Sequence, residues 1–144
     1  MSTKEDYKGF FDDAPVALAR TDVKTGEFLM ANKFLADLLG YKNVQQLKET
    51  CRSKDLYPPE IRQELIDELK EFGVVENKDL ELHLPNGNTT WIRGDFRLTP
   101  EGYIECFLTD ITELMQVKER HLGVLEIMSD KLDFALESTY SIKV

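Results

Sequence analysis

Residues 110–113, Asp110-Ile111-Thr112-Glu113, join the last predicted strand of this chain to a long charged helical tail. Asp110 can cap a helix that begins here, with Glu113 reaching back as in a capping box, and Thr112 is the alternative cap. The chain before this stretch predicts one compact domain, whereas the chain after it predicts a helix that leaves that domain. The stretch is therefore interpreted as a mechanical joint.

Three antiparallel strands are predicted before the joint, because apolar and polar residues alternate there with a period of two. Leu80, Leu82 and Leu84 share one face of the first strand, and Pro85-Asn86-Gly87-Asn88 predicts a tight turn. A second turn is predicted at residues 99–102. By the same alternation, the inward face of the next two strands carries Ile92, Gly94, Phe96, Ile104, Cys106 and Leu108.

The N-terminal part of the chain predicts a short helix and a hairpin. Residues 4–12 are polar with aromatic residues at near-helical spacing, which favours a small docking helix. Residues 16–20 and 27–31 are short apolar runs on either side of a Gly-containing turn at residues 22–26. These two runs are expected to pair as antiparallel strands.

Two further helices are punctuated by capping residues. Asn32 is placed as the N-cap of a helix that Gly40 ends, and Pro58-Pro59 opens a second helix that Gly73 ends. The predicted fold class is therefore α+β. It has one five-stranded antiparallel sheet with helices on one face, an N-terminal docking helix and a C-terminal helical linker.

Charge and cysteine content exclude several kinds of partner. The 144 residues include 27 acidic and 18 basic side chains, a net charge of −9, which argues against binding of nucleic acid and against direct membrane contact. Cys51 and Cys106 have no second Cys or His at metal-ligand spacing, so no zinc site is expected. With no membrane-length apolar run and no secretory signal, a cytoplasmic location is the simplest interpretation.

The C-terminal tail shows an apolar seam with spacings of roughly three and four residues. Lys118 and His121 interrupt this seam. The pattern favours a modest coiled coil, and a surface helix that folds back on its own domain is the alternative. The apolar positions of the seam are Ile111, Leu114, Leu125, Met128, Leu132 and Ala135.

Over about residues 7–115 the chain resembles the PAS sensor family. The resemblance rests on several short motifs taken together, and each of them alone is weak. Asp55-Leu56-Tyr57-Pro58-Pro59-Glu60-Ile61-Arg62 is similar to the segment that leads into the long helix of the family. The other motifs are Asp22, Gly26, Phe28-Leu29-Met30, Asn32, Leu39-Gly40-Tyr41, Asn86-Gly87, Trp91-Ile92, Gly102 and Asp110-Ile111-Thr112-Glu113.

The resemblance implies three parts of the chain. Residues 1–13 would form an N-terminal cap helix, residues 14–111 the PAS domain, and residues 112–144 a signalling helix or coiled-coil linker. Residues 129–144 also resemble the helix that often opens a following domain of the same family, so the chain can be an excerpt of a longer protein. A free C-terminal helix is the alternative.

A PAS fold commonly holds its ligand between the helices and the concave face of the sheet. The inward residues here are almost all apolar, which favours a small apolar or weakly polar ligand. Redox sensing through Cys106 is an alternative to its role as a small core residue. The candidate ligand-binding residues are Tyr57, Ile66, Leu82, Ile92, Phe96, Ile104, Cys106 and Leu108.

Neither flavin nor heme is expected as a cofactor. Flavin-binding members carry a Gly-x-Asn-Cys-Arg-Phe-Leu-Gln motif, of which this chain matches only Cys51-Arg52. Heme-binding members need an axial His near the long helix, and residues 58–72 contain none. Strand alternation turns His83 away from the expected pocket, and His121 lies on the tail.

The outer face of the sheet is a candidate interface. Trp91, Tyr103 and Phe107 are large aromatic residues on a nominally exposed face, so they require a cover. Phe10 and Phe11 of the docking helix, or a second subunit, are expected to provide it. A solvated charged face is the alternative interpretation.

The resemblance therefore implies a sensory and dimerisation module without catalytic residues of its own. Asp110, Ile111 and Thr112 would relay a signal to an effector of the same parent chain, such as a histidine kinase or diguanylate cyclase. A homodimer is expected. The alternative function is a ligand-free scaffold whose core is filled by its own side chains and which only pairs subunits.

Overall fold

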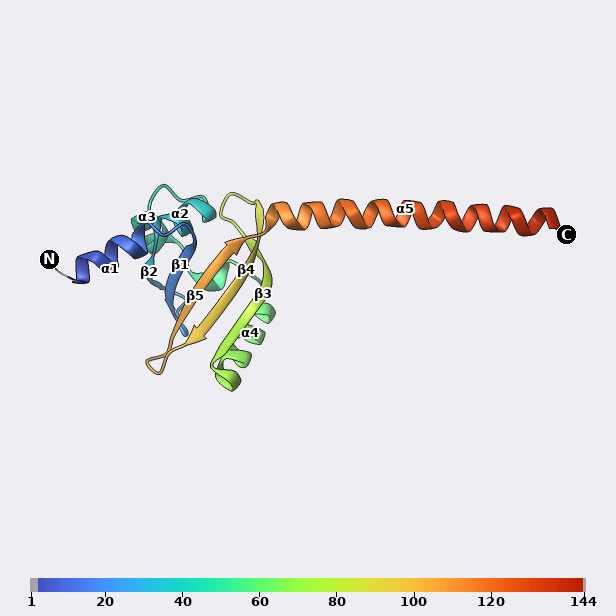
Figure 1. Ribbon diagram of the computed structural model, residues 1–144. Coiled ribbons are helices and arrows are strands. Elements are labelled where there is room, and N and C mark those ends of the chain that lie inside the picture. The colour runs from blue at the N-terminus through green and yellow to red at the C-terminus, as the bar shows by residue number, and fades with distance from the viewer. Residues whose placement is uncertain (1–2, 144) are drawn as a thin grey trace. The chain divides into compact units, whose positions relative to one another are not determined.

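The computed structural model describes the backbone of residues 3–143 and the side chains of residues 7–135. Contacts between residues divide the chain after Ile111 into two units. Figure 1 shows the elements, which run in the order α1 (Thr3–Asp12), β1 (Ala17–Asp22), β2 (Phe28–Ala31), α2 (Lys33–Leu39), α3 (Val44–Thr50), η1 (Ser53–Asp55), α4 (Pro59–Phe72), β3 (Val74–His83), β4 (Thr89–Leu98), β5 (Tyr103–Asp110) and α5 (Thr112–Lys143).

The first unit contains a five-stranded antiparallel sheet in the order β2-β1-β5-β4-β3. The last strand in sequence, β5, therefore lies at the centre, between β1 and β4. Helix α2 packs against β1, α3 against β2, and α4 against β3 and β4. The predicted α+β class, with helices on one face of a single antiparallel sheet, is confirmed.

The segment between α2 and α4, residues 40–58, contains two further regular elements. It forms α3, whose N-cap Asn43 accepts a hydrogen bond from the Gln46 amide, and the single turn η1. Its apolar residues are too sparse to show a helical period, so the capping residue was the only local signal. The turn places Ser53 in a buried position.

Strand β3 begins earlier than the alternation indicated and contains a bulge. The pairing with β4 shifts register between Val75 and Lys78, and Asn77 adopts a left-handed conformation with φ of 53°. The amide of Asn77 donates to the Asp95 carboxylate at 2.8 Å. Because the bulge inserts an extra residue, Val75 and Leu80 are both buried although they are an odd number of positions apart.

Asn32 connects three elements at the start of α2 and is completely buried. Its side-chain oxygen accepts from the amides of Leu35 and Leu18, each at 3.1 Å. Its side-chain amide donates to the carbonyls of Phe11 at 3.1 Å and Val16 at 2.8 Å. The predicted N-cap is thus confirmed, and the same side chain also ties the end of α1 to the hairpin.

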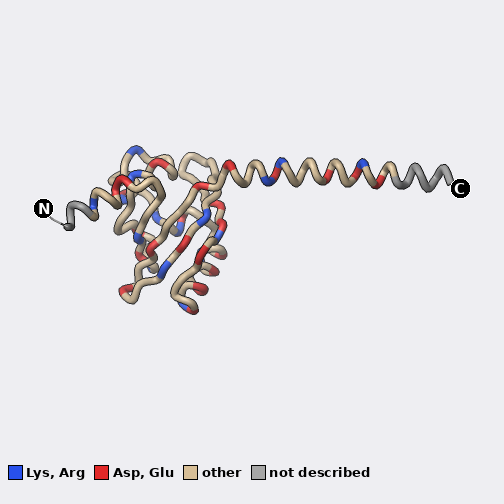
Figure 2. The backbone as a smooth tube through the Cα atoms, viewed as in Figure 1, with Lys and Arg blue, Asp and Glu red and all other residues tan. Residues whose placement is uncertain are grey.

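The outer face of the sheet carries a row of paired charges. Glu105 on β5 pairs with Arg20 on β1 at 2.5 Å and also with Arg97 on β4. These two guanidinium groups hold the pKa of the Glu105 carboxyl below its usual range, with the Arg97 hydrogen bond as the largest cause. Arg93 pairs in the same way with Asp79 at 2.8 Å. The backbone view in Figure 2 shows acidic and basic residues interspersed over the strands of the sheet.

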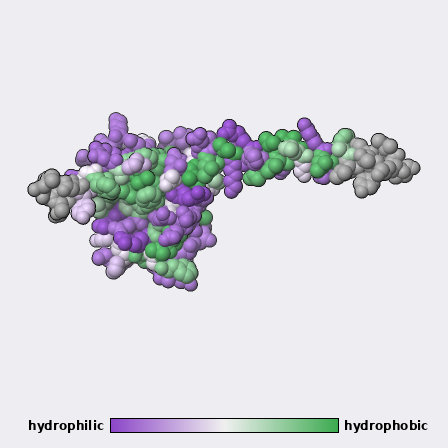
Figure 3. All heavy atoms as spheres, in the orientation of Figure 1, coloured by the Kyte–Doolittle hydropathy of each residue, from purple (hydrophilic) through white to green (hydrophobic). Residues whose placement is uncertain are grey.

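The second unit contains the single helix α5. Its apolar side chains are at least half exposed at several positions, including Leu125 at 50% and Ile127 at 57%. Figure 3 shows apolar and polar patches interleaved along this helix. Leu114, Leu125 and Leu132 lie 11 and 7 residues apart in the sequence, so they fall on nearly one line of the helix surface.

Replacement of Asn32 is expected to be far more destabilising than replacement of another N-cap. Asn32→Ala removes four hydrogen bonds of a buried side chain and should lower the free energy of unfolding by about 2–4 kcal/mol. Asn43→Ala removes the exposed cap of α3, which accepts one hydrogen bond from the Gln46 amide, and should cost about 1 kcal/mol. Urea unfolding of both variants measures the difference, and equal losses would contradict the bridging role of Asn32.

Candidate functional site

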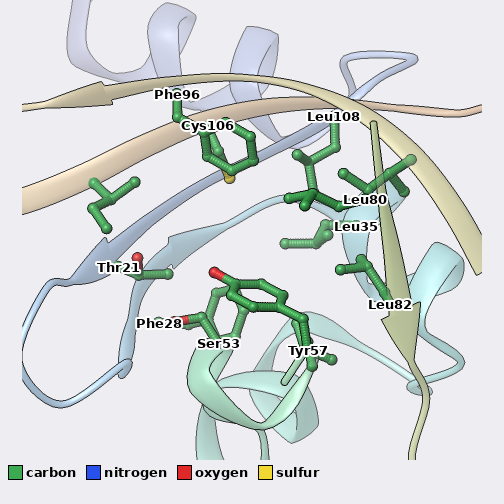
Figure 4. A pocket seen from close by; sticks show the side chains of 13 residues that line it. Thr21, Phe28, Leu35, Ser53, Tyr57, Leu80, Leu82, Phe96, Cys106 and Leu108 are labelled. Carbon is green, nitrogen blue, oxygen red and sulfur yellow. The ribbon is translucent and has the colours of Figure 1, made fainter. Parts of the chain in front are cut away.

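A cavity of about 40 Å³ lies between the sheet and the segment that precedes α4. Its volume is roughly three times the minimum that one ordered water needs, so it suits a molecule of a few non-hydrogen atoms. Figure 4 shows the side chains that surround it. They are Thr21, Phe28, Leu35, Ser53, Leu56, Tyr57, Leu80, Leu82, Ile92, Phe96, Ile104, Cys106 and Leu108.

The cavity has an apolar side and a polar side. Leucine side chains from α2, β3 and β5 form the apolar side. Figure 4 shows the hydroxyl of Tyr57 reaching toward the middle of the cavity, on the side where Thr21 and Ser53 lie. Burial raises the pKa of the Tyr57 hydroxyl above its usual value, so the phenol is neutral near pH 7. The arrangement suits a short molecule with one polar end.

Arg62 of α4 lies behind the polar side. Its side chain is buried, with 9% of the residue exposed. Atom Nη1 donates to Ser53 Oγ at 3.1 Å and approaches the Tyr57 hydroxyl at 3.5 Å, while Nη2 donates to the Val23 carbonyl at 3.0 Å. The guanidinium therefore links α4, the turn η1 and the β1–β2 turn.

Most of the ligand-binding residues predicted from the sequence line this cavity. Ile66 is the exception, because it is packed in the hydrophobic core and does not line the cavity. The cavity is bounded by the residues before α4, and no residue of α4 itself lines it. The predicted residues that do line it are Tyr57, Leu82, Ile92, Phe96, Ile104, Cys106 and Leu108.

The sequence pattern did not identify the polar side. Thr21 was detectable, since it follows Ala17 and Ala19 on the buried face of β1. Ser53 lies in a single turn, where no periodicity marks the inward direction. Arg62 lies on a helix that is largely acidic (Figure 2), and nothing in its spacing indicates that it is buried.

Gly94 shapes the wall of the cavity. A Cβ atom at this position would lie 2.6 Å from a ring carbon of Phe96 and 2.8 Å from Leu108 Cδ2. The absence of a side chain therefore allows the Phe96 ring to lie against the backbone of β4. Any larger residue would push one of these two side chains toward the cavity.

Gly94→Ala is expected to destabilise the domain by about 1–3 kcal/mol through this overpacking. Gly9→Ala is the matched control, because a Cβ at Gly9 meets nothing within 4 Å. Thermal unfolding of both variants provides the comparison. A Gly94→Ala variant as stable as the control would show that Phe96 and Leu108 can move without cost.

The surroundings of both thiols disfavour their ionised form. Burial raises the pKa of the Cys106 thiol to about 12, so it is protonated at neutral pH and serves as a small apolar contact in the cavity wall. Burial also raises the pKa of Cys51, whose Sγ contacts the Arg52 carbonyl at 3.8 Å. The thiolate form that redox chemistry needs is therefore disfavoured at both sites.

The predicted aromatic interface differs from the structure at the docking helix. Phe10 is 80% exposed, and Phe107 on the outer face is 42% exposed, so Phe10 does not cover the outer aromatic residues within one chain. Phe11 instead lines a groove with Met30 of β2 and Val44 of α3. The reason is the Asn32 amide, which holds the Phe11 carbonyl beside the β1–β2 hairpin.

The other two aromatic residues of the outer face are half-buried. The Tyr103 ring lies under the Arg20 guanidinium, 5.7 Å from its centroid. The Trp91 carbonyl accepts a hydrogen bond from the Ile111 amide at 2.8 Å. Trp91, Tyr103 and Phe107 remain candidates for contact with a second subunit.

The predicted relay residues occupy the end of the central strand. Asp110 is the last residue of β5, Ile111 is buried, and Thr112 is the first residue of α5. Strand β5 also supplies Ile104, Cys106 and Leu108 to the cavity wall. The cavity and the start of α5 are thus connected by one continuous strand.

Nothing in the described part of the chain suggests a metal centre. Both histidines, His83 and His121, are exposed, and no cluster of three His, Cys, Asp or Glu side chains occurs among the described residues. None of the helices within residues 3–143 has the length and apolar character needed to cross a bilayer.

Comparison with known proteins identifies the fold. A family model described as "PAS domain" matches residues 5–74. No curated protein matches the chain. Among solved structures, a PAS domain of a protein from Colwellia psychrerythraea has a TM-score of 0.62 and 20% identity, with coverage of 78% of this chain and 99% of that one.

Two further structures show the same fold. A domain of a sensory box sensor histidine kinase/response regulator from Geobacter sulfurreducens has a TM-score of 0.58 at 16% identity, with 74% of this chain and 93% of that chain covered. The PAS domain of a LuxR-family transcriptional regulator from Burkholderia thailandensis, solved in complex with ethanol, has a TM-score of 0.58 at 20% identity, with 74% and 97% covered. Together with the sheet order, these likenesses show that the first unit has the PAS fold, and residues 5–74 match the family model of the PAS domain.

Proposed function

We propose that this PAS domain is a sensory and dimerisation module whose cavity binds a small apolar or weakly polar molecule. Ligand binding is relayed through Asp110, Ile111 and Thr112 to an effector of the same parent chain, such as a histidine kinase or a diguanylate cyclase. The module acts in the cytoplasm and has no catalytic role of its own.

The observation that carries the proposal is the cavity itself. Its wall is apolar on one side and carries hydroxyl groups on the other, and its volume of about 40 Å³ suits a molecule of very few atoms. This volume is far below the roughly 300–1,000 Å³ of drug-sized ligand sites, so a flavin or a heme is too large for it. The structure with bound ethanol among the similar PAS domains supports a ligand of this size class.

The central position of β5 supports the relay. A ligand that contacts Ile104, Cys106 or Leu108 changes the packing of the strand that leads directly to α5. Binding then shifts the balance between two packings of the sheet, provided that the ligand prefers one of them. The similar structures include domains of sensor histidine kinases, which supports a signalling parent protein.

Native mass spectrometry of freshly purified protein tests ligand binding. Wild type and Cys106→Ala are expected to retain or take up a small molecule, whereas Cys106→Leu fills the cavity and should lose at least about tenfold in affinity for it. The two substitutions change the side-chain volume at position 106 in opposite directions: alanine is smaller than cysteine and leucine is larger. The sensing proposal fails if neither wild type nor Cys106→Ala retains a molecule and if no metabolite of a test library raises the melting temperature of either protein.

The second candidate function is the ligand-free scaffold, and α5 supports its pairing role. A single helix of 32 residues with half-exposed leucines leaves a large apolar stripe in water. Two copies of this chain would bury that stripe as a coiled coil, with Leu114, Leu125 and Leu132 at the seam. Pairing is common to both candidates, so the ligand test above separates them.

Leu125→Asp is expected to shift the chain from dimer to monomer in sedimentation equilibrium, with at least about a tenfold weaker association. Ile127→Asp is the control, since this residue is similarly exposed but lies on the opposite side of the helix, about 200° away. A dimer that survives Leu125→Asp, or equal effects of both changes, would contradict pairing through this seam.

A further inference from the structure

A buried positive charge without a carboxylate partner lies behind the polar end of the cavity, where it contacts the lining residues Ser53 and Tyr57. Within residues 7–135, Arg62 forms no ion pair, and its guanidinium is satisfied by two hydroxyl oxygens and one carbonyl. Elsewhere in the domain the partly buried cation Lys78 is paired with Glu68 at 2.8 Å. A buried charge that lacks a counter-ion is unfavourable, and it is stabilised by an anion that enters its surroundings.

The hydroxyl groups between Arg62 and the cavity are oriented by this charge. Ser53 Oγ accepts the Nη1 proton at 3.1 Å, so its own proton points away from the guanidinium. The Tyr57 hydroxyl lies 3.5 Å from the same nitrogen, a long contact, and reaches into the cavity in Figure 4. No acceptor among the described residues takes the protons of Ser53 or Tyr57. Both are therefore available as donors to a ligand oxygen.

We propose that the cavity selects a short-chain carboxylate of two or three carbons. Its oxygens accept hydrogen bonds from Ser53 and Tyr57, its alkyl group lies against the leucine side, and Arg62 supplies the charge that favours the anion over an alcohol of the same length. The inference rests on the proposed sensory function of the same cavity, and it replaces the apolar or weakly polar ligand named above with a small anion that has an apolar tail.

Size and charge together support this choice. The volume of about 40 Å³ accommodates three to five non-hydrogen atoms, which includes acetate and, at the upper limit, propionate. A neutral alcohol can accept the same hydroxyl protons, but it leaves the Arg62 charge uncompensated. Hydrogen bonds to an ionised acceptor are roughly twice as strong as neutral ones, so the anion gains more from the same two donors.

Calorimetric titration at pH 7 with sodium acetate, sodium propionate, ethanol and 1-propanol tests the proposal on the 144-residue chain. Sodium chloride at equal ionic strength controls for salt. We expect a carboxylate to bind at least about tenfold more tightly than the alcohol with the same number of carbons. Alcohols that bind as well as the carboxylates overturn the proposal but leave the sensory function intact. If neither series binds and native mass spectrometry finds no retained molecule, the sensory function itself fails.

Three variants locate the effect. Arg62→Gln should reduce propionate affinity at least about tenfold and change 1-propanol affinity by less than about threefold. Because Arg62 also donates to the Val23 carbonyl, the Arg62→Gln variant can fail to fold. In that case the propionate affinity of Ser53→Ala tests the role of Arg62, because Ser53 accepts a hydrogen bond from it. Thr21→Val is its matched control, since it also removes one hydroxyl from the cavity wall, but no hydrogen bond links Thr21 to Arg62 among the described residues. Equal losses of propionate affinity in Ser53→Ala and Thr21→Val, or unchanged affinity in a folded Arg62→Gln, would refute the role of Arg62.

Discussion

The hydrogen bonds of Asn32 are the constraint on which the first unit depends. One buried side chain satisfies the amides at the start of β1 and α2 and the carbonyls at the end of α1 and just before β1. A side-chain amide supplies an acceptor and two donors at once, whereas a carboxylate lacks the donors and a hydroxyl has only one. With the hairpin and α2 fixed in this way, β1 is positioned to pair with β5 and to place Thr21 in the cavity wall.

Much of the fold follows from local signals, and the polar part of the site does not. Alternation along β4 and β5 identified the inward residues correctly, since the period of a strand depends only on its own backbone. The Asn32 cap was visible because capping is decided within four residues. Ile66 is buried but does not line the cavity, because the direction that it faces depends on how α4 packs. The burial of Arg62 depends on Ser53 and Val23, which are distant in sequence, so no local pattern could reveal it.

The cavity and the core differ in how their side chains fill space. Leucines from α2, α3 and α4 fill the space between helices and sheet almost completely. The cavity persists beside them because Gly94 lets the Phe96 ring lie flat and because the hydroxyls near Arg62 do not fill their end. A charged group that must stay hydrogen-bonded cannot be replaced by closer packing without loss of its partners. The polar end therefore resists collapse, even though its leucine side would favour it.

The bulge in β3 has a consequence for self-association. Strand β3 is one edge of the sheet, and Asn77 interrupts its regular row of hydrogen-bonding groups, with its own amide already committed to Asp95. The other edge, β2, offers only four residues. Edges that are short or kinked are poor templates for an added strand, which protects such a sheet from growing into fibrils. Addition of a strand from a second copy at either edge of this sheet is therefore disfavoured.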